Sequence, residues 1–196
     1  RNRVLGISLC PPTVTCASGI GNVGSVTSKG VEGLFSWSFT PALSWFSSAS
    51  YNASPFSDDY LTNPQDPNTR VATAGKDVQD APRVLFTSAL SLTRGSFLAN
   101  VQGRFVDKRF FTYTNDLKTA GDAEGHVPSS TVFDAGVGYR FETLARGATV
   151  QLNVKNLFDT EYVSTIGTNG FVPFGDYQTL QTGPRRMLFL TVGFDF

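Results

Sequence analysis

The sequence predicts an all-β protein, an antiparallel up-and-down transmembrane β-barrel to which this chain contributes about eight strands. Three observations support this fold class. Apolar and polar residues alternate with the period of two that is typical of a strand with two different faces. The segments between the alternating stretches are long and short in turn. Only 16% of the residues are charged, although the mean hydropathy is −0.09.

The composition argues against several other classes of protein. A soluble domain typically has about 25% charged residues. A membrane-spanning helix needs about 18 or more consecutive apolar residues, and the chain has no such run. Low charge at average hydropathy fits a wall with one apolar and one polar face. The formal net charge of zero gives no electrostatic reason to expect nucleic-acid binding. Many of the 17 Phe, 6 Tyr and 2 Trp residues lie near the ends of expected strands, where barrels carry aromatic girdles.

The alternation is clearest in the last two expected strands. In residues 149–155, Val150, Leu152 and Val154 alternate with polar residues. The final strand, residues 188–196, has an apolar residue at every second position. The same pattern predicts strands at residues 31–40, 43–52, 84–92, 97–105 and 133–141, and a weaker one at residues 1–9.

The charged residues of these segments fall on the polar faces, at Glu32, Arg104, Asp134, Arg140 and Lys155. A Lys or Arg that faces lipid at the middle of the membrane costs about 2–4 kcal/mol. We therefore expect the polar faces to line a water-filled lumen and the apolar faces to contact lipid.

The connections between the expected strands support a barrel over a soluble sandwich, which would also alternate along each strand. Short connections are expected at residues 41–42, 94–95 and 142–147, and long ones at residues 10–24, 53–80, 115–129 and 164–182. Outer-membrane barrels combine short periplasmic turns with long extracellular loops. This parity predicts that the chain ends on the periplasmic side.

Cys10 and Cys16 are the only cysteines, and both fall in a long connection on the expected extracellular side. Oxidising conditions outside the cell favour a disulfide between them, which would contribute about 2–3 kcal/mol by closing a small loop. The alternative is two unpaired thiols. A metal site is not expected here, because no histidine lies nearby.

Four short motifs occur in order along the chain. The first three are Lys29-Gly30-Val31-Glu32, Ser50-Tyr51-Asn52-Ala53-Ser54 and Asp80-Ala81-Pro82-Arg83. The fourth, residues 152–162, contains the pattern N-V-x-N-L-F-D-x-x-Y at residues 153–162. It is followed by Gly183-Pro184-Arg185-Arg186 and a final strand that ends in phenylalanine. In order and spacing they resemble the β-barrel of TonB-dependent outer-membrane receptors, from about residue 20 to the end. The resemblance implies that residues 1–196 are a C-terminal segment of a 22-stranded barrel, without its plug domain.

The residues of the fourth motif have structural interpretations. Asn156 can bond to nearby backbone and end strand pairing. Leu157 and Phe158 would form an apolar anchor at the rim. Asp159 suits a turn, and Tyr162 suits the aromatic girdle. None of these residues needs to contact a solute.

The resemblance also implies a function and a set of partners. Members of this family take up a scarce solute with energy supplied through TonB, commonly an iron–siderophore complex, and in other members cobalamin or carbohydrate. The expected partners are outer-membrane lipid, the remaining barrel strands, the plug domain, and the TonB complex acting through that plug. Phe196 resembles the terminal signal that the barrel-assembly machinery reads. Residues 1–9 read as the middle of a strand, so we expect the chain to be a segment of a longer protein that does not transport by itself.

Nothing in the sequence indicates catalysis, a bound cofactor or a metal centre. The single histidine, His126, lies in a polar loop, and Asp58 and Asp59 are interpreted as solvated loop residues. The solute and its contacts cannot be assigned from the sequence, although the long loops carry aromatic residues such as Phe171 and Tyr177 that could meet it.

Two other functions are compatible with the alternation. One is a complete small eight-stranded outer-membrane barrel with an adhesion or structural role. Such a barrel has an interior filled by side chains. The Ser, Gly and Asn residues of the polar faces are small and would fill that interior poorly. The other is a soluble β-sandwich that acts as a binding domain.

Overall fold

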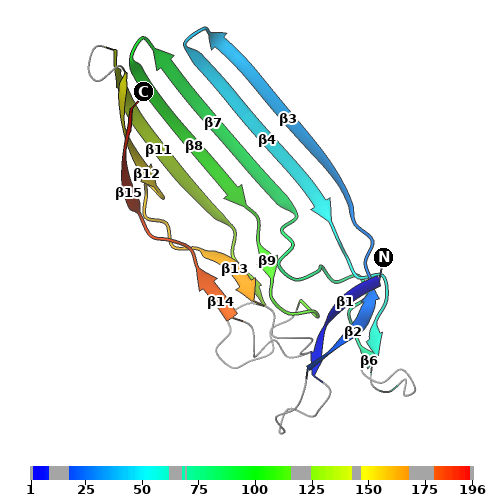
Figure 1. Ribbon diagram of the computed structural model, residues 1–196. Coiled ribbons are helices and arrows are strands. Elements are labelled where there is room, and N and C mark those ends of the chain that lie inside the picture. The colour runs from blue at the N-terminus through cyan, green and yellow to red at the C-terminus, as the bar shows by residue number, and fades with distance from the viewer. Residues whose placement is uncertain are drawn as a thin grey trace.

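The computed structural model describes residues 2–8, 18–61, 68, 70–115, 125–142, 147–167 and 179–194. Within these residues the fold is all-β, and its main element is a curved seven-stranded antiparallel sheet (Figure 1). In spatial order its strands are β15 (Met187–Phe194), β12 (Ala148–Lys155), β11 (Ser130–Phe141), β8 (Phe97–Val106), β7 (Val84–Arg94), β4 (Leu43–Ala53) and β3 (Lys29–Thr40). In the part of the chain that the structure describes, no helix is long and apolar enough to cross a membrane.

The connections alternate in length, as the sequence predicts. At one end of the sheet, short turns join β3 to β4 and β7 to β8, and Figure 1 shows them together. Only residues 142–147 separate β11 from β12 at the same end. Gly95 in the second of these turns has φ of 58°, which costs glycine little. At the other end, which we call the rim, the long connections span residues 54–83, 107–129 and 156–186. The alternation of short and long connections expected for an up-and-down barrel is thus confirmed.

The N-terminal region differs from the expectation. Residues 2–8 do form a strand, β1 (Asn2–Ser8), but it pairs with β2 (Ser18–Ser25) in a separate two-stranded sheet beyond the rim. The main sheet therefore contains seven of the expected strands, and the expected loop at residues 10–24 is partly a strand. The sequence SGIGNVGS of β2 is rich in glycine and lacks a clear alternation, so the periodicity could not reveal it.

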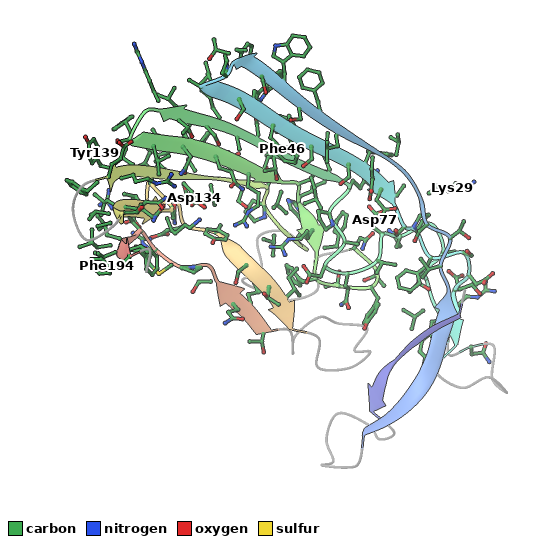
Figure 2. All side chains as sticks on the ribbon, turned by 45° about the horizontal axis from the view of Figure 1, so that its top comes forward. Lys29, Phe46, Asp77, Asp134, Tyr139 and Phe194 are labelled. Atoms are coloured by element: carbon green, nitrogen blue, oxygen red, sulfur yellow. The ribbon has the colours of Figure 1, made fainter. Side chains whose placement is uncertain are left out.

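Strand register confirms the two expected faces. Leu90 lies opposite Trp45 on one side and Val101 on the other, and the same row continues through Ala135, Val154 and Leu188. Polar residues occupy the opposite face, where Arg104 lies between Thr87 and Val132. Figure 2 shows Tyr139 and Phe194 at the short-turn end of the sheet and Asp77 near the rim.

The apolar face is exposed in this structure. Val31 retains 68% of its accessible surface, Leu188 66% and Leu190 68%. Extended apolar patches are uncommon on soluble monomers and mark interaction or membrane surfaces, and no second sheet of the described residues covers this face. An exposed apolar face is what the barrel interpretation predicts for a surface that borders lipid. The sheet is also open, with β15 and β3 as its two edges, so these strands form part of a larger barrel and not a complete small one.

The buried apolar cores lie at the rim. Phe56, Val78 and Tyr113 form one cluster, and Phe111, Val127 and Ile166 form a second. Their residues come from all three long connections, which contain the short strands β5 (Tyr60–Leu61), β6 (Arg70–Val71), β9 (Arg109–Phe110), β10 (His126–Val127), β13 (Val163–Gly167) and β14 (Thr179–Thr182). The described parts of these connections therefore pack together over one end of the sheet, and we call them the rim layer.

The two faces can be tested by placing a charge on each. We expect Leu90→Arg in the complete protein to reduce the fraction of folded barrel, because an arginine facing lipid at mid-strand costs about 2–4 kcal/mol. Ser91→Arg places the same charge one residue along on the polar face and should be tolerated. Folded barrel is measured by its heat-modifiable electrophoretic mobility. Equal loss in both variants would contradict the assignment of the faces.

Candidate functional site: the polar recess and the rim clasp

A recess opens on the polar face next to the rim. It consists of two adjoining hollows of about 380 and 310 Å³, and Arg104, Val132 and Tyr162 line both of them. The strands supply its floor, and the connection from β12 to β15 supplies its rim side. We call it the polar recess and define it by Arg104, Arg109, Asp134, Lys155, Tyr162 and Arg185.

The charges in the polar recess are predominantly positive, since four cationic side chains and one carboxylate line it. The carboxylate, Asp134, uses both of its oxygens. Its Oδ2 accepts a hydrogen bond from Lys155 Nζ at 2.9 Å, and its Oδ1 accepts one from the backbone N–H of Asn156 at 2.9 Å. Arg104 has no hydrogen bond or ion pair with any residue that the structure describes.

Arg109 joins all three long connections. It lies on β9 with only 8% of its surface exposed. Its Nη1 donates to Asp80 Oδ1 at 2.7 Å and to the carbonyl of Ser164 at 3.2 Å, and its Nη2 donates to the carbonyl of Val163. A buried guanidinium needs this many acceptors because losing water without replacement is costly. Arg109 therefore holds the rim layer together and is not free to bind a solute.

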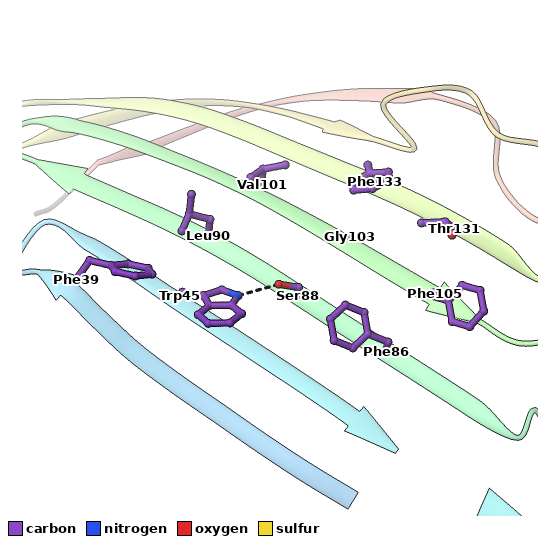
Figure 3. Close-up of a pocket in the computed structure, with 10 residues that line it drawn as sticks. All are labelled: Phe39, Trp45, Phe86, Ser88, Leu90, Val101, Gly103, Phe105, Thr131 and Phe133. Atoms are coloured by element: carbon purple, nitrogen blue, oxygen red, sulfur yellow. Dashed lines mark hydrogen bonds between the residues drawn. The ribbon is translucent and has the colours of Figure 1, made fainter. Parts of the chain in front are cut away.

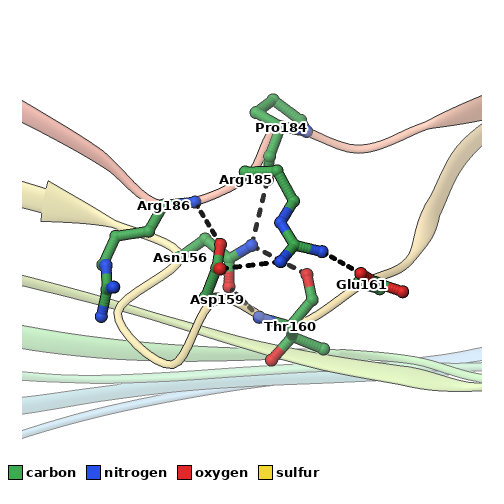
Figure 4. Close-up of polar contacts among 7 residues, drawn as sticks. All are labelled: Asn156, Asp159, Thr160, Glu161, Pro184, Arg185 and Arg186. Atoms are coloured by element: carbon green, nitrogen blue, oxygen red, sulfur yellow. Dashed lines mark hydrogen bonds and ion pairs between the residues drawn. The ribbon is translucent and has the colours of Figure 1, made fainter.

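Asn156 connects the end of β12 to the approach to β15 (Figure 4). Its side chain is 3% exposed. The amide Nδ2 donates to the carbonyls of Thr160 at 2.9 Å and Pro184 at 3.0 Å, while Oδ1 accepts from the backbone N–H of Thr160 at 2.8 Å. Its φ of 51° lies in the left-handed region, which asparagine adopts more readily than most residues. Strand pairing ends here, and the chain turns.

Asp159 adds an ionic contact between the same two segments. Its Oδ1 accepts from the backbone N–H of Arg186 at 2.8 Å, and its Oδ2 pairs with Arg185 Nη2 at 2.8 Å. Arg185 also pairs with Glu161. The hydrogen bond from Arg186 and the charge of Arg185 lower the pKa of Asp159 below its usual value. We call the contacts of Asn156 and Asp159 with residues 184–186 the rim clasp.

The other motif residues divide between the two faces. The N–H of Leu157 donates to the carbonyl of Phe133. The exposed Phe158 ring meets the Phe133 ring edge-on, with 5.4 Å between the ring centroids. Tyr162 lines the polar recess, and its expected place in the aromatic girdle stays a prediction. Its ring lies against Gly183, where a Cβ atom would come within 2.1 Å of a ring carbon. The turn after Asn156 directs the chain over the polar face, which local sequence did not reveal.

Comparison with known proteins identifies the fold family. The family model described as "TonB dependent receptor-like, beta-barrel" matches residues 1–157. The chain belongs to this family.

Solved receptors share the fold at low sequence identity. The unliganded ferric citrate transporter FecA has a TM-score of 0.68 and 20% identity, with 90% of this chain and 24% of that chain covered. The ferric yersiniabactin uptake receptor FyuA from Yersinia pestis has a TM-score of 0.67 and 21% identity, covering 91% and 25%. The siderophore receptor PiuA from Acinetobacter baumannii has a TM-score of 0.68 and 17% identity, covering 97% and 24%. A search of curated proteins finds no match.

This TonB-dependent receptor chain spans about a quarter of the length of those three receptors. In such a barrel wall the polar face borders the lumen and the apolar face borders lipid. The polar recess therefore lies on the lumen side.

A further hollow of about 560 Å³ lies on the apolar face of the receptor wall (Figure 3). Small residues on neighbouring strands create it, since Ser88 lies opposite Gly103. Trp45 Nε1 donates to Ser88 Oγ at 2.8 Å, and a Cβ at position 103 would come within 2.8 Å of the Phe133 ring. This hollow is lined mainly by apolar residues on the face opposite the lumen, so a solute that passes through the lumen does not reach it.

Several residues singled out in the sequence of the receptor chain have other placements. Cys10, Cys16, Phe171, Tyr177 and Phe196 lie outside the described residues. Asp59 accepts hydrogen bonds from the backbone of residues 73 and 74 and pairs with Arg70, and His126 meets the Phe110 ring edge-on. The described residues contain no group of three or more His, Cys, Asp or Glu side chains that could hold a metal ion.

Removing the Asn156 side chain should weaken the rim clasp. Asn156→Gly keeps the positive φ without strain but removes the three part-buried hydrogen bonds of the Asn156 side chain to residues 160 and 184, each of which contributes about 0.5–1.5 kcal/mol. We expect a lower unfolding temperature of the full-length receptor. Asn52→Gly, at an exposed strand position, should cost only about 0.5–1 kcal/mol. Similar unfolding temperatures for the two variants would show that the Asn156 bonds contribute nothing.

The ionic part of the rim clasp should depend on pH. Because the pKa of Asp159 is lower in the folded protein than its ordinary 3.8, its contribution to stability is complete above that value and is lost as the pH falls through the folded pKa. We expect Asp159→Asn to unfold at a lower temperature than wild type at neutral pH, and the difference to vanish in acid. A difference that does not change with pH would exclude the ionised carboxylate as its source.

Proposed function

We propose that this chain is a C-terminal part of the wall of an outer-membrane receptor that takes up an iron–siderophore complex with energy supplied through TonB. The observation that carries the proposal is the polar recess, which places basic and hydroxyl groups on the lumen side of a barrel wall next to the long connections. Solved relatives with the same fold include a ferric citrate transporter and a ferric yersiniabactin uptake receptor. Those names support iron as the cargo of this receptor as well.

The remaining parts of this function belong to a longer protein. The exposed apolar face requires outer-membrane lipid, and the open edges of β3 and β15 require further barrel strands. A plug domain in the lumen would select the solute and contact the TonB complex. Phe196 would present the terminal signal to the barrel-assembly machinery. The family consists of receptors and transporters, and we assign no chemical reaction to this wall.

Growth under iron limitation tests the proposal. Deleting the complete gene should abolish growth on at least one ferric siderophore as sole iron source, and the full-length gene should restore it. A matched panel under copper limitation serves as the control for cargo, because a copper transporter shares the fold with a TM-score of 0.66 at 18% identity. A defect confined to the copper panel, or the absence of any defect with ferric siderophores, would contradict iron uptake. Fractionation should place the protein in the outer membrane.

A further inference from the structure

We propose that Arg104 and Tyr162 form a subsite of the polar recess that binds a carboxylate group of the incoming solute. The inference rests on the proposed uptake function and narrows it to solutes that carry a free carboxylate. It concerns these two side chains because both line each of the two adjoining hollows.

Arg104 lies near enough to Asp134 for a coulombic interaction, but it forms no hydrogen bond or ion pair with a residue that the structure describes. The other cations of the polar recess have carboxylate partners: Arg109 pairs with Asp80, Lys155 with Asp134, and Arg185 with Asp159 and Glu161. Asp134 is two residues along β11 from Val132, the residue opposite Arg104. Both Asp134 oxygens are already engaged by Lys155 and the Asn156 N–H. The Arg104 guanidinium is therefore available to an external anion.

Tyr162 is held in place, yet its hydroxyl has no hydrogen-bond partner among the described residues. The Gly183 N–H donates to the Tyr162 carbonyl at 2.7 Å, and the ring rests on the Gly183 backbone, where no Cβ could be accommodated. The rim clasp holds the two chain segments that form this contact, because Asn156 bonds to Pro184 and Asp159 bonds to Arg185. A half-buried ring with a fixed position and a free hydroxyl is suited to donate to a ligand at small entropic cost.

The donors fit a carboxylate better than other anions. A guanidinium presents two parallel N–H groups that match the two oxygens of a carboxylate, and the hydroxyl adds one donor. The other cations of the polar recess are each paired with a carboxylate, so Arg104 is the cation of the described lining that has no ion pair.

The position of the subsite favours a solute as the source of the carboxylate. Arg104 is two residues from the rim end of β8, and Tyr162 belongs to a long connection. A solute that enters between the long connections would pass these groups. A carboxylate of the domain that fills the lumen would have the same chemistry, and the experiment below distinguishes the two sources.

The test uses the full-length receptor and two probes, ferric citrate, which has free carboxylates, and ferrioxamine B, a ferric trihydroxamate without one. Affinities are measured by isothermal titration calorimetry. We expect ferric citrate to bind more tightly, Arg104→Gln to weaken it by about tenfold or more, and Tyr162→Phe to weaken it less. Arg104→Lys keeps the positive charge but loses the two parallel N–H donors of the guanidinium. Its affinity for ferric citrate should lie between those of the wild type and Arg104→Gln. Added salt should reduce the wild-type affinity more than that of Arg104→Gln.

Arg140→Gln is the matched control. Arg140 is also an arginine on the polar face without a side-chain partner among the described residues, but it lies near the short-turn end and lines neither hollow. We expect its substitution to leave the affinity for ferric citrate within about twofold, which is below the tenfold effect of one charged hydrogen bond.

Three results would overturn the proposal. The first is binding of ferrioxamine B as tight as that of ferric citrate. The second is an unchanged ferric citrate affinity in Arg104→Gln. The third is a lower unfolding temperature of solute-free Arg104→Gln without any change in affinity, which would assign the carboxylate to the lumen domain. If uptake of ferric siderophores persists in any of these cases, the proposed function stands without this subsite. If no ferric complex binds or supports growth, the proposed function and the subsite both fail.

Discussion

Backbone pairing between neighbouring strands determines which side chains face lipid and which face the lumen. Because side chains alternate along a strand, a slip of one residue would move every apolar side chain of that strand to the polar face. The register that places Leu90 opposite Val101 also places Thr87 opposite Arg104. The polar recess and the apolar face are thus two results of one constraint. The described hydrophobic clusters lie at the rim and not within the sheet, so they do not enforce the register of the strands.

Contacts at the rim supply the specificity that a hydrophobic core supplies in a soluble domain. Arg109 binds acceptors on two other connections, and Asn156 binds the carbonyl of Pro184 at the far end of its own connection. Both side chains are almost fully buried, so each has a strong requirement for its partners. Together with the clusters around Phe56 and Phe111, they hold the long connections in a defined arrangement. This arrangement in turn places Tyr162 in the lining of the polar recess together with Arg104.

Features that depend on local period or local turn chemistry could be predicted from the sequence, and features that depend on distant contacts could not. The alternation predicted the faces of Trp45 and Arg104 because both follow from their place along one strand. For Asn156, the bond to Thr160 is of the local kind that its residue type favours. Its bond to Pro184, 28 residues away, has no local signal. The same reason explains why the bridging role of Arg109 and the position of Tyr162 emerged only in the structure.

The two tryptophans of the chain lie opposite each other on adjacent strands, Trp37 on β3 and Trp45 on β4. Both are on the apolar face, away from the polar recess. The Trp45 indole is additionally fixed by its bond to Ser88 and by the edge-on Phe35 ring at 5.1 Å. The intrinsic fluorescence of this chain therefore reports on its lipid surroundings and not on the contents of the lumen. That makes it a built-in optical marker for insertion of the wall into a bilayer.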